Sequence, residues 1–344
     1  ILIIGEQSCG KSSFLNFLKS SLSLPAKKRA PRPTDLREDI FAPPYPRFGR
    51  FEKHFLETKI DGERVGLTLW DSWGLDAGII DLQLQEILDF IDSKFEETFT
   101  EETKLIRCPG GIQDTHIHVV FLLLDPLQLD RTIAARKAAT IEEGWLNGKY
   151  EYSTFGVLDS LEEYMDLKVL RAIQSRCTII PIISKADTVT TSHMNFLKRN
   201  IRECLMKAKI DPLELLRWDD NDNESSGSLG KNSQESDSES DHHCRNIMSP
   251  RYNNLSRCSM RSEFINESTL FPLSIISPDI FEPEVIGRQF PWGVASPLNE
   301  EHCDFVRLKN LVFSEYRKDL RQACWDISYE RWRTRRLNNL RSRS

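Results

Sequence analysis

Residues 1–12, ILIIGEQSCGKS, decide the fold. The four branched apolar residues Ile1–Ile4 are typical of a strand that is buried on both faces of a parallel sheet. The pattern G-x-x-x-x-G-K-S follows, and its glycines let the backbone curl so that its N–H groups point at a chain of phosphates. A helix beginning near Ser12 adds the positive end of its dipole. A chance glycine turn is the weaker interpretation, because strand, spacing and helix agree.

This phosphate loop predicts the contacts of a nucleoside triphosphate. Lys11 is expected to reach the β- and γ-phosphates, and the hydroxyl of Ser12 is expected to coordinate Mg²⁺. The loop backbone is expected to hold the phosphates. The candidate nucleotide-binding residues of this segment are therefore Gly5, Glu6, Gln7, Ser8, Cys9, Gly10, Lys11, Ser12 and Ser13.

A second element of the same kind of site follows a predicted hairpin. Strands are expected at 51–60 and 64–70, joined by Asp61-Gly62, and the second strand runs into Asp71-Ser72-Trp73-Gly74. In phosphate-loop proteins an aspartate here holds the water shell of Mg²⁺, and a glycine three residues later offers its N–H to the γ-phosphate. We therefore predict Ser12 and, through water, Asp71 as metal residues, and Gly74 as a phosphate contact.

The base specificity is predicted by Ser184-Lys185-Ala186-Asp187, which follows a buried strand expected at 177–183. It fits [NTS]-K-x-D, in which the carboxylate of Asp187 accepts hydrogen bonds from N1–H and the exocyclic N2–H₂ of guanine. Adenine offers neither donor there, so it would leave a desolvated charge unpaired. The stem of Lys185 is expected to pack across the base. Lys185, Ala186 and Asp187 therefore indicate GTP and GDP rather than ATP.

The remaining segments are predicted more coarsely. Helices are expected at 79–95, 132–143, 158–175 and 191–208, and further strands at 116–124 and 270–276. In the first of these helices, Leu82, Ile87, Leu88 and Ile91 are expected on the buried side. Residues 24–50 are too rich in proline for a helix or a central strand and are expected to form the first switch. Residues 216–262 contain an acidic, serine-rich run and are expected to be a disordered insertion within one domain.

The overall composition excludes several classes. The net charge is −6 and the pI is near 5.8, which argues against a nucleic-acid partner. No apolar run approaches the roughly 20 residues that span a bilayer. The eight cysteines form no C-x-x-C pair, so free thiols are expected. The chain begins inside a strand and without Met, and we expect an N-terminally truncated domain.

Three C-terminal stretches resemble septins. GRQFPWG at 287–293 and EEHCDFVRLKN at 300–310 resemble the septin-unique element, and ISYERWR at 327–333 resembles the segment after it. With IPIISKAD at 180–187, the likeness runs from Ile1 to about Leu337. The chain is thus identified as a divergent member of the septin family. This implies a single septin-type G domain over 1–344, with the septin-unique element and C-terminal helices at 278–337.

The resemblance implies an α/β fold, namely the three-layer P-loop NTPase fold of Ras-like GTPases with a mostly parallel central sheet. It also implies Mg²⁺ with GTP or GDP, and end-to-end assembly with other septin-like subunits through two surfaces, the nucleotide-pocket face and the terminal-helix face. Carried over by position, Arg288 lies against guanine, the backbone of Ser277 meets the base, and Trp292 packs at the pocket-side interface. The expected location is cytoplasmic and cytoskeletal, at the cell cortex or septum.

Several residues depart from the septin pattern. Ser72 and Trp73 replace Thr and Pro, Ser277 replaces Gly, and His193 replaces Glu. The family's glycine-histidine segment is also missing between Asp125 and Asp166.

The threonine of the first switch that is linked to hydrolysis is missing from its register near Phe48, which leaves Thr34 and Gly74 as the catalytic candidates. The favoured hypothesis is a GTP-binding assembly protein with weak or absent hydrolysis. A slow GTPase that remodels assemblies and a nucleotide-free scaffold are the alternatives. The arginine-rich end at 329–344 leaves contact with anionic lipid open, with an interface or a solvated face as the default.

Overall fold

The computed structural model describes residues 1–23, 51–60, 62–104, 114–147, 165–213, 271–279 and 287–342. The centre of the domain is a sheet in the order β2-β3-β1-β4-β5-β6. Apart from the antiparallel pair β2 and β3, neighbouring strands run parallel. The strands are β1 (Leu2–Gly5), β2 (Phe51–Ile60), β3 (Glu63–Ser72), β4 (Val119–Leu124), β5 (Thr178–Ile183) and β6 (Leu273–Ser274).

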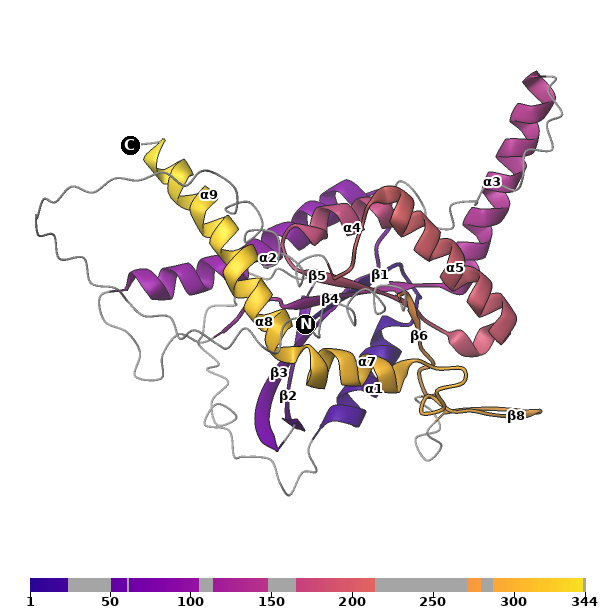
Figure 1. Cartoon of the computed structure of the whole chain (residues 1–344), viewed down its shortest axis with the longest axis horizontal. Coiled ribbons are helices and arrows are strands. Elements are labelled where there is room, and N and C mark those ends of the chain that lie inside the picture. Colours follow the sequence, from indigo (N-terminus) through magenta and orange to yellow (C-terminus); the bar gives the residue numbers. More distant parts are fainter. Residues whose placement is uncertain are drawn as a thin grey trace, which may run out of the picture.

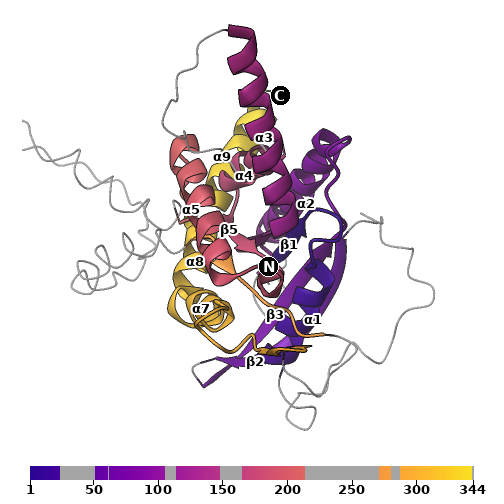
Figure 2. The same ribbon diagram turned by 90° about the vertical axis from the view of Figure 1, so that its right-hand side faces the viewer.

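Helices cover both faces of this sheet, so β1, β4 and β5 are buried at every position. Figure 1 shows α2, α4 and α5 on one side of the sheet and α1 and α7 on the other, and in Figure 2 the same layers are seen from the side. The rings of Phe17 in α1 and Phe305 in α7 lie 4.2 Å apart. These helices are α1 (Lys11–Leu22), α2 (Ile80–Thr103), α4 (Asp166–Gln174), α5 (Thr191–Ala208) and α7 (Phe305–Asn310). The predicted three-layer α/β fold is confirmed.

The C-terminal part continues from α7 as a nearly unbroken helical path. Two π-helical turns interrupt it, η4 (Leu311–Glu315) and η5 (Cys324–Tyr329), with α8 (Arg317–Ala323) between them and α9 (Glu330–Arg341) after them. Helix α9 packs on α2, where Arg336 pairs with Glu96 at 3.0 Å. Before α7, the strands β7 (Arg288–Phe290) and β8 (Gly293–Ala295) form a separate hairpin.

Helix α3 (Pro126–Asn147) extends beyond the predicted range 132–143 at both ends, and its ribbon rises away from the sheet (Figure 1). Its earlier start has a local cause: the Asp125 carboxylate accepts a hydrogen bond from the Leu127 N–H at 3.0 Å, and Pro126 fits the first helical position. The predicted strand at 116–124 begins only at Val119.

The predicted buried side of α2 is wrong at Leu82, which is 68% exposed. The buried positions follow the spacing of Ile80, Leu84, Ile87 and Ile91, and Leu82 lies on the opposite side of the helix because successive residues turn by about 100°. The helix also runs on to Thr103 rather than ending at 95. The predicted first switch at 24–50, with Thr34, and the insertion at 216–262 lie outside the described residues.

Within the described ranges, none of the helices combines the length and the apolar character that crossing a membrane requires.

His116 is a buried histidine in an aromatic cluster. Its ring centroid lies 4.9 Å from Phe95, 4.4 Å from Trp325 and 5.0 Å from Tyr329. No group in the described part of the chain forms a hydrogen bond with either ring nitrogen. Burial lowers the pKa of His116 to about 4, although Asp114 opposes the shift.

This burial predicts a loss of stability in mild acid. Because the folded pKa lies below that of the unfolded chain, the contribution is complete above about pH 6.5 and is lost as the pH falls toward 4. We expect the free energy of unfolding to fall by about 2 kcal/mol between pH 7.5 and pH 5 through His116 alone. Urea denaturation of the wild type and His116→Phe at both pH values measures this. An equal pH dependence in the two proteins would contradict the prediction.

Candidate functional site

The phosphate loop is a closed turn between β1 and α1. A Cβ at Gly5 would lie 2.6 Å from the Leu123 carbonyl oxygen, so only glycine fits beside β4. Gly10 has φ +94°, a conformation that favours glycine. The Lys11 ammonium donates to the carbonyl oxygens of Gly5 at 3.1 Å and Glu6 at 2.6 Å, so it lies curled inside the loop.

The segment after β3 packs directly on this loop. The Leu75 N–H donates to the Gly5 carbonyl oxygen at 2.9 Å. A Cβ at Gly74 would lie 2.5 Å from the Cα of Gln7, so a larger residue would push the two segments apart. The buried Gln83 of α2 holds this segment, since its Nε2 donates to the Gly74 carbonyl oxygen at 3.1 Å and its Oε1 accepts from the Asp76 N–H at 2.8 Å.

The predicted metal residues are brought together. The hydroxyl of Ser12 donates to Oδ2 of Asp71 at 3.2 Å. Oδ1 of Asp71 is buried, and no described residue donates a hydrogen bond to it. Burial raises the pKa of Asp71, and the hydrogen bond from Ser12 partly opposes this shift. A hydroxyl beside a carboxylate with an unused buried oxygen suits Mg²⁺, which prefers oxygen ligands and retained water.

The base box is anchored to the end of β4. The N–H and the hydroxyl of Ser184 both donate to the Leu124 carbonyl oxygen, at 2.9 and 3.1 Å. The Ala186 N–H donates to the Ile275 carbonyl oxygen at 3.1 Å. Lys185 lies between them with φ +51°, an uncommon conformation that these hydrogen bonds on both sides hold.

Among the groups of this site, the Asp187 carboxylate gives the strongest indication of which ligand the site can bind. Its side chain is 1% exposed, and neither oxygen accepts a hydrogen bond from any described residue. Nη1 of Arg288 lies 3.4 Å from Oδ2, and Nε of Arg288 donates to the Ser277 carbonyl oxygen at 3.1 Å. Asp187, Ser277 and Arg288 therefore meet, although they come from three separate segments. Two buried oxygens without hydrogen bonds fit the two donors on one edge of guanine.

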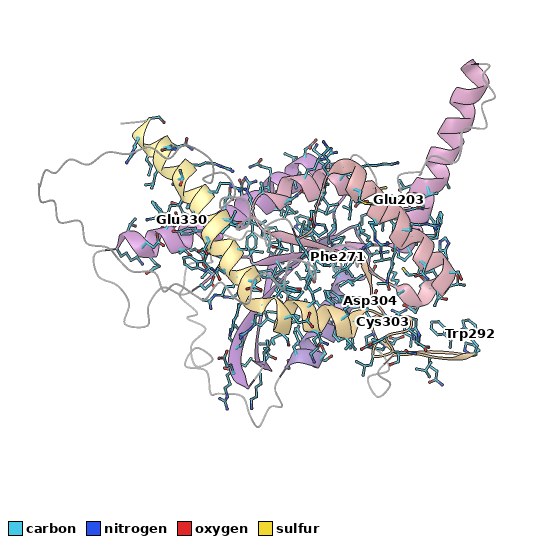
Figure 3. The ribbon with its side chains drawn as sticks, in the orientation of Figure 1. Glu203, Phe271, Trp292, Cys303, Asp304 and Glu330 are labelled. Carbon is cyan, nitrogen blue, oxygen red and sulfur yellow. The ribbon has the colours of Figure 1, made fainter. Side chains whose placement is uncertain are left out.

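Beside this group lies a cavity of about 360 Å³ between α5, the β7–β8 hairpin and the segment before α7. Asp187, Trp292 and Asp304 are among its lining residues. Trp292 is 82% exposed, stacks on Phe290 at 5.3 Å, and lies toward the outer end of the hairpin (Figure 3). Its prediction as an interface residue stays a prediction.

The predicted nucleotide and metal residues that the structure describes lie after β1, β3 and β5, with Ser13 in the first turn of α1, Ser277 after β6 and Arg288 on β7. Thr34 lies outside the described residues. Sequence reasoning missed Gln83 and Asp125. The sequence does contain a signal for Asp125, because an Asp-Pro pair directly after a buried strand indicates the start of a helix. Gln83 had none.

The comparisons with known proteins all match septins. A family model described as Septin matches residues 159–238 and 261–344. Human Septin-5 is 23% identical over 353 residues, covering 100% of this chain and 74% of that protein. Human Septin-4 is 24% identical over 345 residues, covering 99% of this chain and 56% of that protein. The crystal structure of a septin GTPase domain from Chlamydomonas reinhardtii superposes with a TM-score of 0.52 at 16% identity, covering 97% of this chain and 96% of that one.

Proposed function

Since the chain belongs to the septin family, we propose that it binds GTP and GDP with Mg²⁺ at this site and assembles with other septin-like subunits, with weak or absent hydrolysis. The observation that carries the proposal is the buried Asp187 carboxylate, whose two oxygens accept no hydrogen bond from the described residues and of which one lies 3.4 Å from Nη1 of Arg288. Burying a carboxylate without hydrogen bonds costs free energy, which the ion pair with Arg288 offsets only in part, so a ligand that supplies donors would be stabilised here. N1–H and N2–H₂ of guanine are such donors.

Each part of the site has a role in binding. Lys11 would exchange its two carbonyl partners for phosphate oxygens, which attract the ammonium more strongly because they are charged. Ser12 and Asp71 would hold Mg²⁺, the latter through water, and the metal neutralises phosphate charge. Arg288, fixed by the Ser277 carbonyl, would line the base with a planar guanidinium.

Hydrolysis has less support. A GTPase needs a group that orients the attacking water, and Gly74 offers only its backbone N–H. The remaining candidate, Thr34, belongs to the predicted first switch at 24–50, which lies outside the described residues. A slow GTPase therefore remains the second hypothesis, and a nucleotide-free scaffold the third.

Assembly is proposed through two faces. The exposed Trp292 of the β7–β8 hairpin supports the pocket-side face, since an exposed aromatic next to a cavity is typical of a binding surface. Helix α9 supports the terminal-helix face. Its Arg333 and Arg336 already pair with Glu102 and Glu96 of α2, which favours a protein interface or a solvated face over anionic lipid. We propose a cytoplasmic, cytoskeletal location at the cortex or septum.

The test is to purify the protein, denature it and identify the released nucleotide by ion-exchange chromatography. Stoichiometric GTP is expected for a binding subunit without turnover. Mostly GDP favours the slow GTPase, and single-turnover kinetics with GTP then separates hydrolysis from direct uptake of GDP. A pocket that stays empty after adding Mg²⁺ and GTP would overturn the proposal and leave the scaffold.

A further inference from the structure

Asp125 occupies a central position among the binding segments. It follows β4, and β4 lies between β1, which leads into the phosphate loop, and β5, which leads into the base box. A side chain at the carboxyl end of the middle strand can therefore contact the segments that follow both neighbours.

The contacts of Asp125 use both carboxylate oxygens. Oδ2 lies 2.5 Å from Nζ of Lys185, and Oδ1 accepts the Leu127 N–H at 3.0 Å. The Asp125 side chain is only 14% exposed, so this ion pair is less screened by water than a surface pair. One carboxylate thus caps α3 and holds the lysine of the base box.

Lys185 in turn reaches the phosphate loop. Its Cε lies 4.0 Å from the position that a Cβ on Gly10 would occupy. The lysine stem therefore runs beside the loop, with the ammonium fixed by Asp125. The Lys185 side chain is a flexible four-carbon chain. Without a partner its ammonium would move into water, and the stem would no longer run beside the phosphate loop.

We propose that Asp125 is a positioning residue for guanine nucleotide: it acts through Lys185, whose stem it holds between the base and the phosphate loop. This inference rests on the proposed function. It predicts that nucleotide affinity depends on the charge of Asp125, whereas discrimination among bases, which belongs to Asp187, does not.

The experiment is a double-mutant cycle with Asp125→Ser and Lys185→Met. Serine keeps the helix cap but is too short and uncharged to hold the lysine. Asp130→Asn is the matched control, since Asp130 lies on α3, the helix that Asp125 caps, but pairs with His193 at 2.9 Å. For each protein, the Kd of GDP and of IDP in Mg²⁺ is measured by calorimetry, together with the thermal midpoint without nucleotide.

We expect Asp125→Ser to weaken GDP binding roughly tenfold. The substitution removes the charged hydrogen bond that holds Lys185, and a loss of this size is typical of hydrogen bonds between charged groups. In the Lys185→Met background the same change should have less than about a twofold effect, because its partner is gone. In Asp125→Ser the ratio of GDP to IDP affinity should stay at the wild-type value, and Asp130→Asn should bind GDP with wild-type affinity. The thermal midpoint without nucleotide shows that each variant is folded.

Unchanged GDP affinity in Asp125→Ser would overturn the inference, as would an equal loss in the Lys185→Met background or an altered ratio of GDP to IDP affinity. Failure of the wild type to bind GDP would instead contradict the proposed function, so the two failures are distinguishable.

Discussion

Asp187→Asn is expected to weaken GDP binding by about 100-fold or more. The wild-type carboxylate can accept both guanine donors, whereas the amide offers one acceptor and places its NH₂ against N2–H₂. Since the Asp187 side chain is 1% exposed, water cannot restore the lost hydrogen bond. The Kd of GDP in Mg²⁺, measured by calorimetry, is the quantity to compare.

The same substitution should favour xanthine. Xanthine keeps N1–H but carries a carbonyl oxygen at C2, to which the Asn amide can donate, so XDP should bind the variant more tightly than GDP does. Asp92→Asn is the matched control, because it removes the same charge from an ion pair between Asp92 on α2 and Arg176, which lies between α4 and β5, away from the base box. Unchanged GDP affinity in Asp187→Asn would contradict the assignment of the base pocket.

Phe121→Ala is expected to have the largest effect on stability, with a loss of about 3–5 kcal/mol in the free energy of unfolding. Phe121 is fully buried at the centre of β4, opposite Ile3 on one side and Ile180 on the other. Its ring meets that of Phe14 edge to face at 5.8 Å. Removing the ring loses this contact and leaves a cavity that rigid parallel strands cannot close.

Urea denaturation with the same buffer and nucleotide content measures the change. Met206→Ala on α5 is the control, since Met206 is 64% exposed and should cost less than about 0.5 kcal/mol. A loss below about 1 kcal/mol for Phe121→Ala would contradict the central place of β4 in the core.

The sequence by itself determined the fold class, the phosphate loop and the base box. These signals are local: a run of apolar residues, glycines at fixed spacing, and Ser184–Asp187 at the end of a strand. Spacing along the backbone dictates which groups converge on a phosphate, so no distant contact is needed to recognise them. The septin-like strings near Arg288 likewise predicted that it belongs to this site, and its Nη1 lies 3.4 Å from Oδ2 of Asp187.

Only the tertiary structure decided which distant groups meet. The pairing of Asp125 with Lys185 joins residues 60 positions apart, and the hold of Gln83 on Gly74 depends on how α2 lies against the loop. The exposure of Leu82 on α2 also depends on how that helix packs against the rest of the domain. Local preferences describe each segment alone, whereas these contacts follow from how strands and helices pack side by side, and small rotations of a helix change them.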